Sequence, residues 1–436
     1  MTFERPAAPG GSLRRVWITG IGVLSPNGIG RRAFWESTRE GRSGLGAITL
    51  FDASHLACRV AGEVRGIDLG SALPSSERRR VSRAAPMGVL AAREALEDAG
   101  LEPESLDPEA RERFGVLIGS GAGGIEYAER QYQLYYEGRL HEVNPYAIPS
   151  SFAGSLSSEI SMALGLRGPS HVISNGCSSS SDALGYAMDQ IRWGRADRLL
   201  AGGVDACITP GILTGFCRMR VVSTGYNETP ASASRPFDRG RDGFVLGEGA
   251  WMFVLEEAER ARRRGARPWA ELAGYGSTCD AHHRVALAPD GVQPARAIRL
   301  ALEDAGLSPA EIDYVNAHGT STPMNDPIET RAFKLALGER ARQVPVSSSK
   351  SLVGHPQGAC GALGVAATAL AIARAFVPPT LNLDHPDPEC DLDYVPHRGR
   401  PAYLRAALCN CISFGSKNSA LVLRRVEGEP DRSGDP

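Results

Sequence analysis

The sequence predicts an α/β fold built from two similar halves, residues 13–262 and 265–426. Short β-branched and apolar runs alternate with longer segments rich in Ala, Leu and Arg, as expected when strands alternate with helices. The heptapeptide Ala-Leu-Glu-Asp-Ala-Gly-Leu occurs twice, at 95–101 and 301–307. Each copy ends an amphipathic helical pattern and precedes a predicted strand, so we predict that each half is a sheet covered by helices.

The composition is that of an ordinary globular protein. Of its 436 residues, 42% are hydrophobic and 22% are charged, and the formal net charge is −2. This balance provides no strongly basic surface for nucleic acid. The most apolar stretch, 363–376, is interrupted by Arg374 and is too short to span a bilayer. We therefore expect neither nucleic acid nor a membrane among the partners of this protein.

The two ends of the chain and its cysteines indicate a cytoplasmic protein. Residues 1–12 are rich in Pro and Gly, and both they and residues 427–436 are predicted to be flexible tails. The first residues lack the apolar core of a signal peptide. Nine cysteines, an odd number without C-x-x-C spacing, argue against a disulfide framework and against a zinc module. We predict that the protein binds no metal.

The first half carries a cysteine at the start of a predicted helix. Its clearest predicted strands, in order, are 16–19, 116–118, 172–173 and 199–200. Helical spacing of apolar residues then places a helix at about 179–193, and Cys177 lies between it and the strand at 172–173. The positive end of a helix dipole lowers the pKa of a thiol, so this position favours a nucleophile over a structural cysteine.

The second half carries two histidines and a lysine on loops. His318 follows a predicted strand at 312–316, where a side chain between small residues can exchange protons with a ligand. Lys350 and His355 precede an Ala/Gly-rich helix from Gly358, which corresponds in order to the helix after Cys177. If the two halves face each other, the cysteine and the two histidines form a nucleophile-and-base set in one pocket.

Ordered sequence blocks along nearly the whole chain, from about 15 to 425, carry a family resemblance. They are the Cys177, His318 and His355 segments together with Leu-Arg-Gly-Pro-Ser at 166–170, Ser-Arg-Pro-Phe-Asp-Arg-Gly at 234–240, Val-Pro-Pro-Thr-Leu-Asn-Leu at 377–383 and Cys-Asp-Leu-Asp-Tyr-Val-Pro at 390–396. The chain resembles β-ketoacyl-acyl-carrier-protein synthases, especially the synthase II type and its type II polyketide relatives. This resemblance implies the thiolase fold, with its five-layered α-β-α-β-α arrangement.

The resemblance also implies a reaction and a set of catalytic residues. Cys177 would take an acyl chain from an acyl carrier protein, and His318 and His355 would assist decarboxylation of malonyl carrier protein. The resulting enolate attacks the acyl group, so no cofactor is implied. The backbone N–H groups of Cys177 and Phe414 would form the oxyanion hole, with Phe414 as a gate. Lys350 would order the histidine loops.

Further positions are implied to support the site or to line its pocket. Asp326 and Glu329 match the acidic residues that follow the first histidine of the family. The substrate pocket would be lined by Ala122, His283, Thr320 and Thr322.

The chain also departs from the family pattern. A glutamate common in the family is replaced by Gly364, which suggests Glu329 as an alternative counter-charge for Lys350. Lys417 stands where the family usually has threonine. Ala122 replaces an isoleucine at the implied pocket floor. These departures favour a polyketide or polyene pathway over routine fatty-acid elongation.

Two other interpretations fit parts of the pattern. A degradative thiolase would use a second cysteine as its base, and Cys409 and Cys411 lie near the corresponding loop, but the paired histidines fit a synthase better. The chain could instead be inactive alone and require a chain-length-factor-like subunit. The resemblance predicts a dimer, either with a second copy or with such a subunit.

Overall fold

The computed structural model describes residues 13–428 and Arg432, and its centre is one 11-stranded mixed sheet. The strands run in the order β12-β11-β15-β16-β10-β1-β9-β7-β5-β6, with β2 beside β1. Their bounds are β1 (Val16–Ser25), β2 (Gly28–Ile29), β5 (Phe114–Gly119), β6 (Ser170–Ile173), β7 (Arg198–Asp205), β9 (Gly249–Glu257), β10 (Ala270–Cys279), β11 (Tyr314–Asn316), β12 (Val346–Ser347), β15 (Ala406–Ser413) and β16 (Lys417–Arg424).

The strands of the two predicted halves are joined, which differs from the expectation of two separate sheets. β1 and β10 pair antiparallel over two positions, Trp17 with Glu271 and Ile18 with Ala270. Beside this pair, Arg15 forms an ion pair with Glu271. The pairing satisfies backbone groups that a free strand edge would otherwise leave without partners.

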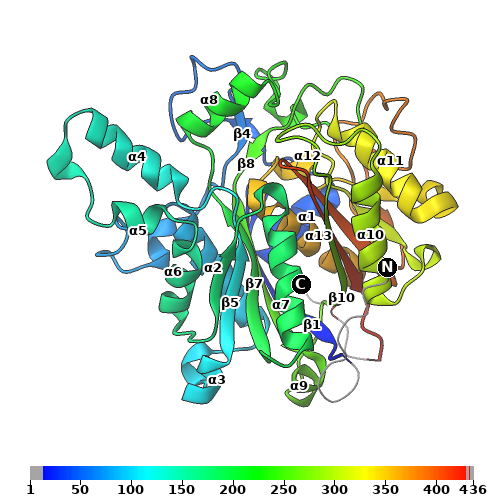
Figure 1. Cartoon of the computed structure of the whole chain (residues 1–436), viewed down its shortest axis with the longest axis horizontal. Coiled ribbons are helices and arrows are strands. Elements are labelled where there is room, and N and C mark those ends of the chain that lie inside the picture. The colour runs from blue at the N-terminus through cyan, green and yellow to red at the C-terminus, as the bar shows by residue number, and fades with distance from the viewer. Residues whose placement is uncertain (1–12, 429–431, 433–436) are drawn as a thin grey trace.

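Helices lie in three groups, and each group packs into its own apolar cluster (Figure 1). The helices α2 (Ala84–Asp98) and α6 (Ser155–Leu164) cover the outer face of the first strands. The helices α10 (Val292–Ala305) and α11 (Asn325–Leu337) cover the outer face of the later strands. Between the inner faces lie α7 (Ser179–Arg192) and α13 (Cys360–Arg374), which are buried among side chains of both.

Shorter elements complete the described chain. The remaining strands are β3 (Gly46–Ala47), β4 (Val60–Gly62), β8 (Leu246–Gly247), β13 (Phe376–Val377) and β14 (Arg400–Pro401). The remaining α-helices are α1 (Arg31–Glu40), α3 (Pro108–Glu112), α4 (Ile125–Tyr136), α5 (Ala147–Ser151), α8 (Pro210–Met219), α9 (Ala258–Arg263) and α12 (Lys350–Val353). Across the described residues, every helix is too short or too polar to cross a bilayer.

The repeated heptapeptide makes the same contact in both places. It ends α2 in its first copy and α10 in its second. The aspartate of each copy accepts a hydrogen bond from a strand backbone: Asp98 from the N–H of Ile21, and Asp304 from the N–H of Tyr275, both at 2.9 Å. The repeat predicted from the sequence is therefore a repeated helix-to-strand connection.

Glycine on the strand lets each of these helices approach closely. A Cβ atom at Gly20 would lie 2.0 Å from the carbonyl oxygen of Ala95, and one at Gly274 would lie 2.2 Å from that of Ala301. Any larger residue would push the helix away from the sheet.

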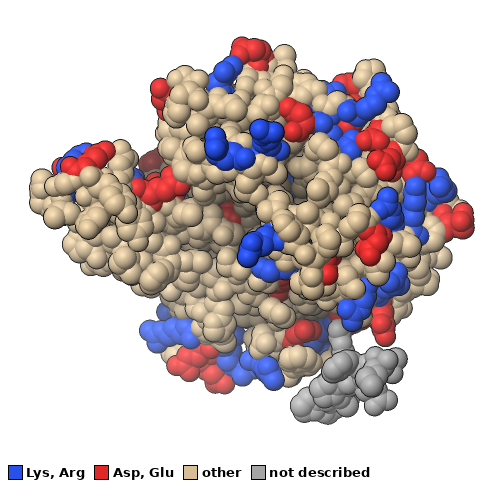
Figure 2. Space-filling model, turned by 45° about the horizontal axis from the view of Figure 1, so that its top comes forward, with Lys and Arg blue, Asp and Glu red and all other residues tan. Residues whose placement is uncertain are grey.

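An arm of residues 125–152, which contains α4 and α5, projects from the body of the molecule (Figure 1). Many of its large apolar side chains are exposed, namely those of Ile125, Tyr132, Tyr135, Tyr136, Leu140, Tyr146, Ile148 and Phe152. Figure 2 shows that the surface on this side of the molecule is largely uncharged. The arm lies on the side of the sheet where β6 is the last strand.

The two predicted tails differ in what the structure describes. Residues 1–12 lie outside the described residues. In the second tail, Arg432 is buried; its guanidinium bonds to the carboxylate of Asp98 at 2.6 Å and stacks on Trp269. Within this predicted tail, a buried ion pair and an aromatic face hold the Arg432 side chain.

Candidate active site

Cys177 lies in a single 3₁₀ turn, Gly176–Ser178, between β6 and α7. Its side chain is buried, and burial, followed by the neighbouring Cys360 thiol, raises the pKa of Cys177 to about 12. The expected strand–turn–helix position is therefore present, but the expected low pKa is not. Removal of the thiolate from water outweighs the positive charge of Lys350.

The three predicted catalytic side chains meet at one cavity. Cys177, His318 and His355 all line a cavity of about 400 Å³, and their reactive atoms lie within 4.8 Å of one another. The two imidazole rings stand nearly perpendicular, with centroids 5.3 Å apart. The convergence of segments from both halves, predicted from the sequence, is thus observed.

Both histidines are held in their neutral forms. Burial, and after it the charge of Lys350, lowers the pKa of His318 and of His355 well below the usual value. The Nδ1 atom of His318 lies 3.3 Å from Nζ of Lys350, which can only donate. The Nδ1 atom of His355 accepts from the N–H of Gln357 at 3.0 Å. We therefore assign the proton of each ring to Nε2.

Lys350 contacts the His318 segment rather than a carboxylate. Its Nζ donates to the carbonyl oxygen of His318 at 2.6 Å. Among the described residues it forms no ion pair with an acidic side chain, so the predicted pairing with Glu329 is wrong. A Cβ atom at Gly364 would lie 2.8 Å from the Asn316 side chain, which leaves little room for a glutamate there without movement.

Glu329 and Asp326 instead hold the backbone of the His318 loop. Glu329 accepts hydrogen bonds from the N–H groups of His318 and Gly319, both at 2.7 Å. Asp326 accepts from the N–H of Thr320 at 3.1 Å. Burial raises the pKa of both carboxyl groups. The two acidic residues thus hold the backbone of the loop that carries His318.

The expected oxyanion hole is only half available. The backbone N–H of Phe414 lies near the Cys177 thiol, where it acts to lower the pKa of that group. The N–H of Cys177, however, donates to Oγ of Ser413 at 2.8 Å. That hydroxyl donates in turn to the carbonyl oxygen of Asn175 at 2.9 Å. Ser413 must therefore turn away before both N–H groups can serve one oxyanion.

The predicted pocket residues divide into two groups. His283, Thr320 and Thr322 line the catalytic cavity, and the two threonine hydroxyls lie 2.9 Å apart. Ala122 does not line this cavity. Ala122 packs against an apolar cluster that Phe414 also contacts, and its N–H donates to Asp205. The prediction that Ala122 forms the floor of the cavity is therefore wrong for this conformation, because Ala122 is not among the residues that line the cavity.

Sequence reasoning missed Asp205, which ties three segments together near the nucleophile. This buried carboxylate accepts from the hydroxyl of Ser120 and from the N–H groups of Gly121 and Gly358, at 2.6 to 2.7 Å. Burial raises its pKa. Ser413, Cys360 and Cys411 were likewise not identified as parts of the site. The one available signal was the position of Asp205 at the end of a strand followed by small residues.

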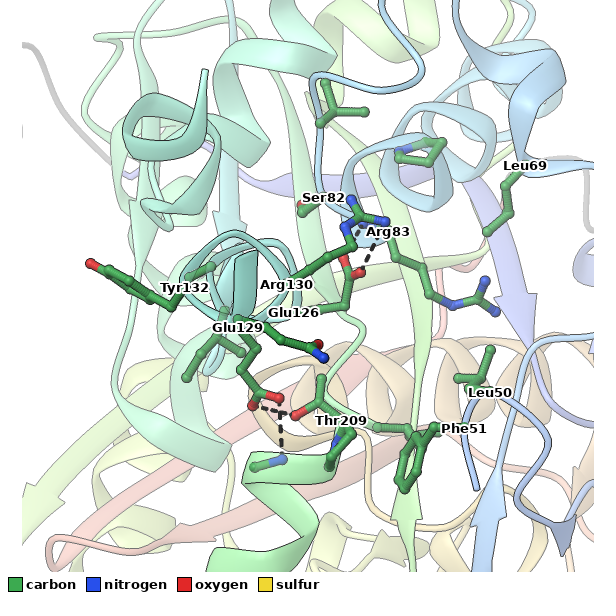
Figure 3. Close-up of a pocket in the computed structure, with 18 of the residues that line it drawn as sticks. Leu50, Phe51, Leu69, Ser82, Arg83, Glu126, Glu129, Arg130, Tyr132 and Thr209 are labelled. Atoms are coloured by element: carbon green, nitrogen blue, oxygen red, sulfur yellow. Dashed lines mark hydrogen bonds and ion pairs between the residues drawn. The ribbon is translucent and has the colours of Figure 1, made fainter. Parts of the chain in front are cut away.

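A larger hollow, of about 1010 Å³, lies against α4 and contains none of the predicted catalytic residues (Figure 3). Leu50, Phe51 and Tyr132 are among its apolar lining residues. Glu129 accepts hydrogen bonds there from the hydroxyl of Thr209 at 2.6 Å and from the N–H of Gly211 at 3.1 Å. This hollow lies between the arm and the body of the molecule, apart from the cavity around Cys177.

Two family models match the chain. Residues 13–261 match the N-terminal domain of β-ketoacyl synthases, and residues 269–384 match their C-terminal domain. The chain is 43% identical to 3-oxoacyl-[acyl-carrier-protein] synthase 2 of Synechocystis, over 95% of this chain and 99% of that one. It is 46% identical to a putative polyketide β-ketoacyl synthase 1 of Streptomyces virginiae, over 95% and 98% of the two chains.

Solved structures agree with these relatives. The ishigamide ketosynthase/chain length factor matches with a TM-score of 0.88 and 35% identity, covering 95% of this chain and 100% of the other. A type II polyketide ketosynthase in complex with its acyl-carrier protein matches with a TM-score of 0.87 and 34% identity, at the same coverage. The chain belongs to the β-ketoacyl synthase family and is a β-ketoacyl-acyl-carrier-protein synthase, an acyltransferase of the fatty-acid synthase II or type II polyketide kind.

Proposed function

We propose that Cys177, His318 and His355 carry out a decarboxylative Claisen condensation on the thiolase fold. The three helix groups, with the two parts of the sheet between them, support the assignment to the α-β-α-β-α arrangement. The observation that carries the proposal is the meeting of one cysteine and two neutral histidines, from segments far apart in the chain, at one cavity.

In the first step Cys177 receives an acyl group from the acyl carrier protein. The sulfur attacks the thioester carbonyl, and the carbonyl oxygen is stabilised by the N–H of Phe414 and, once Ser413 has turned, by that of Cys177. The carrier leaves as a thiolate and takes up the proton lost by Cys177. Burial raises the pKa of Cys177, so this thiol reacts only as its proton is removed.

In the second step malonyl carrier protein loses its carboxylate as CO2. The Nε2–H groups of His318 and His355 donate to the thioester oxygen, which becomes an enolate oxygen as the carbon–carbon bond breaks. The enolate carbon then attacks the acyl carbonyl on Cys177. The sulfur leaves with its electron pair and is protonated again, and the product is two carbons longer with a β-keto group. Neutral histidines fit this role because they donate without trapping the enolate as an ion pair.

Intact-mass spectrometry tests these assignments directly. The protein and Cys177→Ala are incubated with a panel of acyl carrier thioesters and then with malonyl carrier protein. We expect acylation of the wild-type protein alone, followed by transfer to a product two carbons longer. An adduct that persists in Cys177→Ala would disprove the assignment of the nucleophile.

For the pathway, we propose a type II polyketide or polyene synthase. Relatives that support it include the tetracenomycin polyketide synthase ketoacyl synthase alpha subunit of Streptomyces glaucescens, 44% identical over 94% of this chain. A fatty-acid role fits the Synechocystis relative equally well by identity. Repeated extension of one acyl chain without reduction between cycles supports the polyketide role, whereas a single extension per encounter supports the fatty-acid role.

For the partner, we propose a dimer through the arm and the outer edge of β6. The arm exposes apolar surface at Tyr135, Tyr136 and Phe152. Several large apolar side chains exposed together are typical of a protein–protein interface. The partner is a second copy or a chain-length-factor-like subunit. Molar mass measured by light scattering, alone and after co-expression with a homologous subunit lacking the cysteine, distinguishes the two. A monomer under both conditions would contradict the interface.

For the carrier protein, we propose that it docks near Arg220. This exposed arginine borders the cavity beside Met219, and an acidic carrier is attracted to such a charge. Arg220→Glu should raise the KM for malonyl carrier protein and leave the decarboxylation of a small malonyl thioester unchanged. An equal loss of activity with both substrates would mean that Arg220 stabilises the fold of the site and does not bind the carrier.

A further inference from the structure

Two thiols lie behind His318 that the proposed condensation does not use. Cys360 is the first residue of α13, and Cys411 is on β15. Both are buried, their sulfur atoms are 3.4 Å apart, and neither lines the catalytic cavity. Two sulfurs in contact at that distance form a vicinal dithiol.

This dithiol contacts two of the proposed catalytic residues, Cys177 and His318. The thiols of Cys360 and Cys411 both donate to the carbonyl oxygen of Cys177, at 3.0 and 3.2 Å. Their sulfurs lie 4.0 and 3.5 Å from Nδ1 of His318. Any change in the bonding of these sulfurs therefore acts on the nucleophile and on a histidine together.

The hydrogen bond between the two thiols makes them unequal. The hydrogen bond from Cys411 and the positive charge of Lys350 lower the pKa of Cys360 although burial opposes this, whereas burial raises the pKa of Cys411. Cys360 is thus the member that favours the thiolate, and the thiolate is the form that reacts with peroxides.

We propose that Cys360 and Cys411 are an oxidative modification site, a dithiol that hydrogen peroxide closes into a disulfide. The Cys360 sulfur attacks one peroxide oxygen, the O–O bond breaks, and the second oxygen leaves as water once protonated. The Cys411 sulfur then attacks the sulfenic acid, the S–O bond breaks, and a second water leaves. Two thiols and one peroxide give one disulfide and two waters. The sulfurs must approach from 3.4 Å to a bond of about 2.05 Å, a side-chain adjustment.

Closing the disulfide should stop the condensation. A disulfide has no S–H group, so the carbonyl oxygen of Cys177 loses both thiol donors. The two sulfurs also contact Nδ1 of His318, so drawing them together should shift the imidazole ring. This effect rests on the proposed function, whereas disulfide formation itself does not.

The test maps the disulfide by peptide mass spectrometry after hydrogen peroxide treatment of the whole protein, with and without reduction. We expect loss of two hydrogens and a linked Cys360–Cys411 peptide in the wild-type protein, and no such peptide in Cys411→Ser. Cys409→Ser is the matched control, because Cys409 is a buried cysteine on the same strand that contacts Thr368 instead. It should form the disulfide like the wild-type protein.

Two readouts separate this proposal from the proposed function. Dithiothreitol should restore condensation activity to the oxidised wild-type protein. Oxygen added to Cys177 alone, or a disulfide between Cys177 and either thiol, would overturn the proposal. If the protein kept full activity with the Cys360–Cys411 disulfide formed, the claim that this disulfide inhibits condensation would be wrong. The same disulfide in a protein that never accepts an acyl group would leave the modification site standing and remove the proposed function.

Discussion

Lys350 holds His318 at two atoms of the same residue, with Nζ 2.6 Å from its carbonyl oxygen and 3.3 Å from its Nδ1. The first contact fixes the loop and the second fixes the ring. Because the ammonium only donates, it keeps the Nδ1 lone pair occupied and the proton on the far nitrogen. Lys350 thus determines which ring nitrogen of His318 carries the proton, and it can do so without contacting the substrate.

Replacing Lys350 by Met should impair decarboxylation and move its pH dependence. The charge of Lys350 lowers the pKa of His318, so its loss raises that pKa toward the usual value. In the variant His318 becomes protonated at a higher pH, so activity falls at a higher pH on the acid side. The pH profile of malonyl carrier protein decarboxylation measures this. Lys334→Met, which removes a surface partner of Asp391, is the control and should leave the profile unchanged.

His355→Ala should slow decarboxylation by about 10²–10³, the usual effect of losing one donor to a developing oxyanion. Acylation of Cys177 should persist, because the thioester carbonyl there relies on backbone N–H groups. His355→Asn retains an N–H donor and should recover part of the rate. Single-turnover release of labelled CO2 and intact mass report the two steps separately. Equal loss of both steps would show that His355 acts in acylation as well.

Alkylation of Cys177 by iodoacetamide should accelerate steadily with pH. Burial raises the pKa of Cys177 to about 12, so the thiolate fraction grows about tenfold per pH unit far below that value. Between pH 6 and 10 the rate should show no plateau. Peptide mapping confirms the site, and Cys177→Ala supplies the background. A plateau near pH 8 would mean that the helix dipole, and not burial, controls this thiol.

Ser413→Ala should speed the acylation of Cys177. The serine hydroxyl occupies the N–H of Cys177, and breaking one neutral hydrogen bond costs about 0.5–1.5 kcal/mol, so its removal should raise the rate by up to about tenfold. Pre-steady-state acylation by an acyl carrier thioester measures it. Ser416→Ala, which alters the neighbouring loop at its contact with His283, is the control. A slower Ser413→Ala variant would mean that this hydroxyl holds the Phe414 segment in its working position.

Local pattern was enough to predict where the reactive residues lie along the chain. Cys177 at a helix start and His318 after a strand follow from periodicity over a dozen residues, and both positions are confirmed. The repeated heptapeptide also predicted the matching helices α2 and α10. The family resemblance supplied Phe414, whose N–H the structure places at the nucleophile.

Contacts between residues far apart in the sequence could not be predicted from local sequence patterns. Cys360 meets Cys177 from 183 residues away, and Ser413 meets it from 236 residues away. Neither periodicity nor spacing encodes such approaches, because they depend on how α13 and β15 pack against the turn before α7. For the same reason the pKa of Cys177 was predicted in the wrong direction, since burial is a property of the packed molecule.

The matching bonds of Asp98 and Asp304 have an evolutionary consequence. A scaffold present twice can keep its helix-to-strand connections while its loops diverge, and here one copy bears the nucleophile and the other the two imidazoles. Neither copy holds a complete set, so a chain cut between them would yield two catalytically silent fragments. The reaction therefore needs the catalytic residues of both copies at once.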